Sequence, residues 1–112
     1  MGMDAGYCIV MTTCPDQGSA EDMATVLVEA GLAACVNILS NVRAVYRWQD
    51  RLEKSMETLL LIKTRQDHYT AVEQAIVTRH PYELPEVVAL PMVAGLPAYL
   101  GWLDTVLESS KM

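Results

Sequence analysis

Residues 57–64 have the sequence Glu-Thr-Leu-Leu-Leu-Ile-Lys-Thr, and this stretch decides the fold. Its leucines and isoleucine occupy both alternating sets of positions, so a strand here presents apolar side chains on both faces. A small antiparallel sheet with one solvated face should alternate apolar and polar residues instead. We therefore expect a central strand over 57–64 whose two faces are both covered.

The segment before it, residues 34–48, alternates with the period of a strand. It is long for a single strand, so Asn41 near its middle predicts a bulge or a bend. The polar run Gln49-Asp50-Arg51 then predicts the tip of a hairpin that joins this segment to the strand over 57–64. The apolar side of the alternation consists of Val36, Ile38, Val42, Ala44, Tyr46 and Trp48.

The N-terminal part of the chain predicts a strand and then a helix. Tyr7–Thr13 is short, apolar and rich in β-branched residues, which favours a strand. Ser19 and Asp22 have the spacing of a capping box, so we expect the helix to begin at Ser19. Gly31 is placed to end that helix in a left-handed conformation. The helix has one apolar stripe, made of Met23, Val26, Leu27 and Ala30.

The C-terminal part repeats this order. Thr64 and Asp67 have capping-box spacing and predict a second helix that ends before His80-Pro81. A fourth strand is expected over 86–93, apolar on both faces, and Pro97 suits the first turn of a last helix. The apolar stripes of the two helices are Tyr69, Val72 and Ile76, and then Leu100, Leu103, Val106 and Leu107.

These elements define the fold class. The order predicts an α+β, ferredoxin-like βαββαβ antiparallel sheet with an extended second–third strand hairpin and a C-terminal helix. Right-handed crossovers place the first two helices on one face of the sheet. The other face is apolar as well, so we expect it to be covered by further copies of the chain, in a homo-oligomer built through the sheets and the long hairpin. We expect residues 1–112 to form a single domain and residues 1–6 to be disordered.

Composition excludes several classes of protein. The chain has 112 residues, 52% hydrophobic and 20% charged, with a net charge of −6. This is too apolar for a disordered chain, and the longest apolar run is broken by proline and glycine, so no membrane partner is expected. The acidic balance without a basic cluster argues against nucleic acid. Without a leader sequence or a disulfide framework, the cytoplasm is the expected location.

Several stretches together resemble the CutA family of divalent-cation tolerance proteins. The resemblance runs from about Tyr7 to Leu107 and implies a ferredoxin-like homotrimer with hairpins bridging the subunits. It also implies residence in the cytoplasm and a role in tolerance of divalent metals, copper above all. The chain departs from the family pattern at Gln49-Asp50, where relatives commonly carry Glu-Gly. The matching stretches are Thr13–Asp16, Leu32–Ile38, Tyr46–Trp48, Leu61–Thr64, His80–Glu86 and Tyr99–Leu103.

Thiol and imidazole groups suggest a copper site. The topology brings Cys14, at the end of the first strand, to the same sheet edge as His80, and this donor pair suits Cu(II). A closed structural site takes four ligands, so the pair would need Glu83, water or a neighbouring subunit to complete it. The alternative is that both residues serve packing. Cys8 is expected to be a small buried hydrophobe, and His68 a solvated residue.

Lys63 gives a second candidate site. A lysine on a central strand needs a partner, and Glu57 lies too far along that strand, so the carboxylate of a neighbouring subunit is one solution. The other is an anionic ligand in an intersubunit cleft near Trp48, Tyr82 and Glu86, by analogy with the trimeric PII signal proteins. The chain lacks the common hydrolase, phosphate-loop and zinc-protease motifs, so no enzymatic activity is expected.

Overall fold

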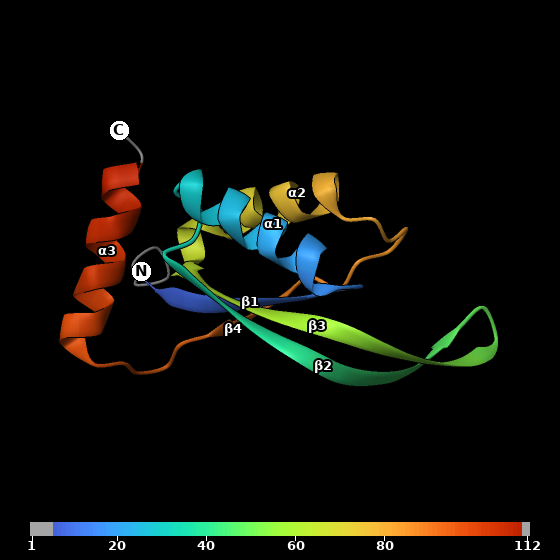
Figure 1. Cartoon of the computed structure of the whole chain (residues 1–112). Coiled ribbons are helices and arrows are strands. Elements are labelled where there is room, and N and C mark those ends of the chain that lie inside the picture. Colours follow the sequence, from blue (N-terminus) through green and yellow to red (C-terminus); the bar gives the residue numbers. More distant parts are fainter. Residues whose placement is uncertain (1–5, 111–112) are drawn as a thin grey trace.

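The structure is a computed structural model that describes residues 6–110. These residues form one four-stranded antiparallel sheet in the order β2-β3-β1-β4, which confirms the predicted βαββαβ arrangement and the α+β class (Figure 1). Of the segment expected to be disordered, residues 1–5 lie outside the described part, whereas the Gly6 carbonyl accepts a hydrogen bond from the Gln66 amide. The elements are β1 (Tyr7–Cys14), α1 (Gln17–Glu29), β2 (Cys35–Trp48), β3 (Arg51–Arg65), η2 (Gln66–His68), α2 (Tyr69–Arg79), β4 (Val88–Pro91) and α3 (Pro97–Ser110).

One face of the sheet, here called the closed face, is covered by α1 and α2 (Figure 1). Every second residue of β1 points to this side and is buried, and the same is true of the inner part of β3. The right-handed crossovers therefore place both helices as predicted. The side chains buried between the layers include Cys8, Val10, Ala20, Met23, Leu27, Leu60, Ile62, Val72 and Ile76.

The opposite face, here called the open face, has no helix lying over its central strands (Figure 1). Cross-strand pairing places Met11, Leu61 and Val88 in one row of this face, and Ile9, Lys63 and Leu90 in the next. Val88 is 45% exposed and Leu90 51% exposed. The predicted apolar character of both faces is confirmed, and in a single chain the second face lies open to water.

The hairpin of β2 and β3 extends beyond the rest of the sheet as an arm (Figure 1). The predicted irregularity is confirmed, because the pairing register shifts between Leu39 and Val42 and Asn41 has a φ of 63°. At the tip, Gln49 and Asp50 have φ values of 52° and 65°, which is the left-handed pair of a two-residue hairpin turn. β3 begins at Arg51 rather than at residue 57, because its polar N-terminal half pairs with β2 along the whole arm.

The helix starts differ from the sequence prediction. α1 is capped by Asp16 and not by Ser19: the Asp16 carboxylate accepts the Ser19 amide hydrogen bond at 2.8 Å. Thr64 does not cap α2 either, because its hydroxyl donates to the Leu32 carbonyl at 2.7 Å, on the closed face. A single 3₁₀ turn, η2, comes between β3 and α2 instead. Gly31 ends α1 as predicted, with a φ of 76°.

The C-terminal elements differ in two ways: β4 is shorter than predicted, and α3 lies at the end of the sheet. β4 pairs only with β1 and spans Val88–Pro91 rather than residues 86–93. α3 begins at Pro97 as predicted and packs against the end of the sheet, not over its open face (Figure 1). Its predicted apolar stripe is confirmed by Leu103 and Leu107, which are fully buried. Within residues 6–110, no helix is long and apolar enough to span a membrane.

Candidate functional site

The first predicted pair, Cys14 and His80, lies at the end of β1. Cys14 is fully buried, and the His80 ring contacts the Thr13 carbonyl, one residue before Cys14, at 2.7 Å. The topology therefore places thiol and imidazole at the same sheet edge, as the sequence analysis expected. Burial, and after it the charge of Asp16, raises the pKa of the Cys14 thiol above its ordinary value. The thiol is consequently protonated at neutral pH.

Both ring nitrogens of His80 are engaged. Nδ1 accepts a hydrogen bond from the Tyr82 amide at 3.1 Å, which leaves the proton on Nε2 to be donated to the Thr13 carbonyl. The two rings of His80 and Tyr82 lie close, with centroids 4.7 Å apart. In this arrangement His80 fixes the loop between α2 and β4 onto the end of β1.

The same loop carries Tyr82 to a buried carboxylate, Glu57. Glu57 is 7% exposed, and its Oε2 accepts hydrogen bonds from the Ser55 hydroxyl at 2.9 Å and the Tyr82 hydroxyl at 3.4 Å. Burial, together with the nearby Glu57 charge, raises the pKa of Tyr82 to about 12. Both residues stand out in the sequence, but no sequence pattern predicts this contact. The only signal was a charged residue at the start of an otherwise apolar strand.

A single chain does not build a closed metal centre at this place. Glu83, the third predicted ligand, is exposed in the loop after Tyr82. Among residues 6–110, no group of three or more His, Cys, Asp and Glu side chains is placed to hold a metal ion. The donors present are therefore a thiol and an imidazole, and binding of copper by Cys14, His80 and Glu83 stays a prediction.

The residues of the predicted ligand cleft are spread over the chain. Lys63 lies near the inner end of β3, where its ammonium donates to Asn37 Oδ1. Trp48 pairs with Arg51 at the tip of the arm, while Glu86 is exposed just before β4. One chain does not gather these residues around Tyr82. A cleft containing Lys63 would need a second subunit, and that cleft also stays a prediction.

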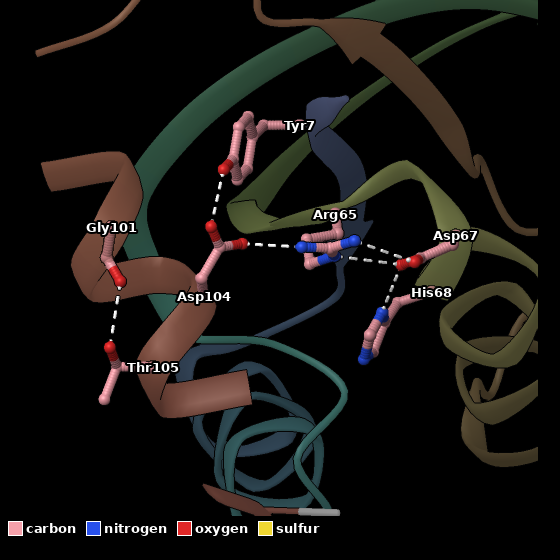
Figure 2. Close-up of polar contacts among 7 residues, drawn as sticks. All are labelled: Tyr7, Arg65, Asp67, His68, Gly101, Asp104 and Thr105. Atoms are coloured by element: carbon pink, nitrogen blue, oxygen red, sulfur yellow. Dashed lines mark hydrogen bonds and ion pairs between the residues drawn. The ribbon is translucent and has the colours of Figure 1, made fainter. Parts of the chain in front are cut away.

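A separate polar cluster holds α3 in place (Figure 2). The Arg65 guanidinium donates to Asp104 at 2.6 Å and pairs with Asp67 at 3.1 Å, and the Tyr7 hydroxyl also donates to Asp104, at 2.8 Å. The hydrogen bond from Arg65 lowers the pKa of Asp67 to about 2. The Tyr7 hydroxyl, followed by Arg65, lowers the pKa of Asp104. No sequence pattern predicted this cluster, because its members come from four elements, and β1 and α3 lie far from β3 and η2 in the chain.

His68 belongs to the same cluster, and here the sequence prediction is wrong. His68 is 7% exposed rather than solvated, and its Nδ1 lies 2.7 Å from Asp67 Oδ1. The short η2 turn causes the difference, because it directs the ring inward just before α2 begins. Both histidines of the chain are thus held by hydrogen bonds inside the domain.

The fold and these residues define a class of small α+β proteins with a four-stranded antiparallel sheet and a long hairpin arm. The model of the CutA1 divalent ion tolerance protein family matches residues 8–106. The chain therefore belongs to the CutA1 divalent ion tolerance family, which confirms the resemblance found in the sequence.

Individual relatives agree with this assignment. A protein CutA homolog of Xenopus laevis is 43% identical over 94 residues, which cover 84% of this chain and 62% of that protein. The chain thus spans less than two thirds of the length of that relative. A divalent-cation tolerance protein CutA of Thermus thermophilus is 41% identical over 95 residues, covering 85% and 92% of the two chains. The crystal structure of CutA from Xylella fastidiosa has a TM-score of 0.87 at 42% identity, covering 90% of this chain and 97% of that one.

Proposed function

We propose that this chain is a cytoplasmic, homotrimeric divalent-cation tolerance protein, that copper is its principal ion, and that it is not an enzyme. The observation that carries the proposal is the contact of the His80 ring with the Thr13 carbonyl, one residue before the buried Cys14, in a chain of this family. Sulfur and imidazole are donors that copper prefers over harder ligands.

The open face supports a homotrimer. It carries exposed Leu39 on β2 and exposed Val88 and Leu90 on β4, the two outer strands, so apolar residues are present on both sides of the sheet. A surface of that kind marks an interaction site in soluble proteins. Further copies of the chain would cover it, and the arm is long enough to reach over a neighbour.

The geometry at the end of β1 favours reversible binding over permanent binding. Copper must displace a proton from the buried Cys14 thiol, and it must compete with the carbonyl and amide that hold the His80 ring. Both requirements weaken binding, and the first makes it stronger as pH rises. Glu83 is free at the surface to supply an oxygen ligand, and a neighbouring subunit would supply another.

The cysteines support the proposed location. Cys8, Cys14 and Cys35 are all free thiols, with Cys8 and Cys14 buried. Free thiols persist in a reducing compartment and are uncommon in oxidising ones. The cytoplasm is such a compartment.

Native mass spectrometry during titration with Cu(II) and, separately, Zn(II) tests the proposal. We expect a trimer that takes up one copper ion per subunit and prefers copper to zinc. Cys14→Ala and His80→Ala should each abolish this uptake. Cys8→Ala is the matched control, since it removes a buried thiol from the other end of the same strand and should leave uptake unchanged.

Three outcomes would contradict the proposal. Stoichiometric copper binding that survives in both variants would exclude this pair of ligands. A wild-type protein that stays empty, or takes up both metals without saturation, would exclude copper binding as the function. A monomer at micromolar concentration would exclude the trimer.

A further inference from the structure

Glu57 is a buried carboxylate with no cationic partner in the described chain. Both of its hydrogen bonds come from hydroxyl groups, Ser55 and Tyr82, and both reach the same oxygen. The ion pairs between described residues involve only Arg65 and His68 as cations. A charge removed from water needs a counter-charge as well as hydrogen bonds. Residues 6–110 therefore leave Glu57 in need of a cation from outside this part of the chain.

Lys63 is in the complementary position. Its ammonium contacts the neutral side-chain oxygen of Asn37, and no carboxylate within residues 6–110 pairs with it. Its cross-strand neighbours are Ile9 and Cys35, and Leu90 follows beyond Ile9. When the open face is covered, the ammonium will be enclosed by apolar side chains. It will then need an anion.

The two charges lie on the same face but cannot reach each other within one chain. Both occupy odd-numbered positions of β3, so their side chains leave the sheet on the open face. They are six positions apart, which is about 20 Å along a strand. Leu59 and Leu61 fill the space between. The open face therefore carries an anion and a cation at two ends of an apolar strip.

We propose that Glu57 of one subunit and Lys63 of the next form an ion pair across the open face. The inference rests on the proposed homotrimer and adds to it the residues that set how the subunits align. In a closed three-fold ring the contact is heterologous, so each chain offers Glu57 to one neighbour and Lys63 to the other. Tyr82 and Ser55 hold the carboxylate in position, and Asn37 does the same for the ammonium.

Charge reversal tests this pairing, with native mass spectrometry for the subunit number and thermal unfolding at a fixed protein concentration. Glu57→Lys alone and Lys63→Glu alone each set like charges against one another, and each should abolish the trimer. The combined Glu57→Lys, Lys63→Glu variant restores opposite charges at every contact and should recover the trimer. As a matched control, Glu53→Lys combined with Lys63→Glu reverses another carboxylate of the same strand and should not recover it.

Neutral variants keep the test valid if a reversed chain fails to fold. Glu57→Gln and Lys63→Gln should each lower the unfolding midpoint by about 10 °C or more, because each leaves one buried charge unpaired. The unfolding midpoint of the variant with both Gln substitutions should be no lower than that of the less stable single variant.

The outcomes separate the two proposals. A wild-type trimer whose combined reversal stays monomeric, or whose two Gln substitutions act additively, would overturn the ion pair and leave the trimer intact. A wild-type monomer would overturn the trimer itself.

Discussion

The two faces of the sheet are similarly apolar but differ in what covers them. On the closed face, Leu60 and Ile62 are fully buried under α1 and α2. On the open face, Leu61 is only half-buried, and Val88 and Leu90 on β4 are exposed. The closed face supplies the stability of the chain by itself. The open face is as apolar as a protein core, but its side chains are exposed to water. Such a surface usually indicates an interface.

The largest expected effect comes from the closed face. Leu60→Ala removes a fully buried side chain from the central strand and should lower the free energy of unfolding by about 2–5 kcal/mol. Chemical denaturation measures the change. Leu52→Ala is the control on the same strand, because Leu52 is 66% exposed and should change stability by less than about 0.5 kcal/mol. Equal losses in the two variants would contradict the description of the closed face.

The open face should respond in assembly and not in folding. Leu90→Asp places a charge on the open face, so it should leave the secondary structure intact and shift the protein from trimer to monomer at micromolar concentration. Size-exclusion chromatography and circular dichroism measure the two properties. The matched control is Val77→Asp on α2, since Val77 and Leu90 are 54% and 51% exposed. If both variants remain trimeric, the open face is not the interface.

The cluster at the end of the sheet should make stability depend on acid. The Asp67 carboxyl has a pKa of about 2, below its ordinary value of 3.8, so its contribution is complete above pH 4 or so and is lost as pH falls towards 2. Because the side chain is more than a third exposed, solvent screening limits that contribution to about 1 kcal/mol or less.

Asp67→Asn removes this contribution. The unfolding midpoints of wild type and variant should differ at pH 6 and converge near pH 2. Asp22→Asn, on the exposed side of α1, is the control and should follow the wild type at every pH. Parallel curves for Asp67→Asn and wild type would show that the cluster adds nothing to stability.

The smallest expected effect lies at the tip of the arm. Gln49 and Asp50 both adopt left-handed backbone conformations without glycine. Asp50→Gly should therefore stabilise the hairpin, by about 0.5–1 kcal/mol. Asp50→Ala is the control, because it removes the carboxylate but keeps the Cβ that the left-handed conformation disfavours. Thermal unfolding compares the two, and a gain in Asp50→Ala would assign the effect to charge instead.

The N-terminal ends of the helices were the least accurate part of the sequence prediction. Ser19 and Thr64 both have the spacing of a capping box, yet neither caps a helix. Asp16 is the N-cap of α1 because it directly precedes the helix and its carboxylate accepts a hydrogen bond from the Ser19 amide. Thr64 lies on the closed face, where the buried hydroxyl finds the Leu32 carbonyl. Short motifs therefore placed the helices to within a few residues but did not identify their caps.

At the candidate site, too, the sequence predicted the approximate position of the residues but not their contacts. The chain order alone brought Cys14 and His80 to one sheet edge, because antiparallel strands of known order fix which ends meet. It did not predict that the two nitrogens of His80 are already hydrogen-bonded, or that Tyr82 reaches Glu57. These contacts depend on the path of the loop between α2 and β4, for which the sequence offers no periodic pattern.

The sequence by itself determined the fold class, the two apolar faces of the sheet, the long hairpin with its bulge at Asn41, and the CutA family. Each of these follows from a pattern of period 2 or 3.6, or from motifs in a fixed order along the chain. Only the tertiary structure decided that Glu57 is buried without a cation among residues 6–110, that His68 is enclosed, and that Tyr7, Arg65 and Asp104 meet. These residues lie far apart in the chain, and the contacts between them form only when the packed elements bring their side chains together.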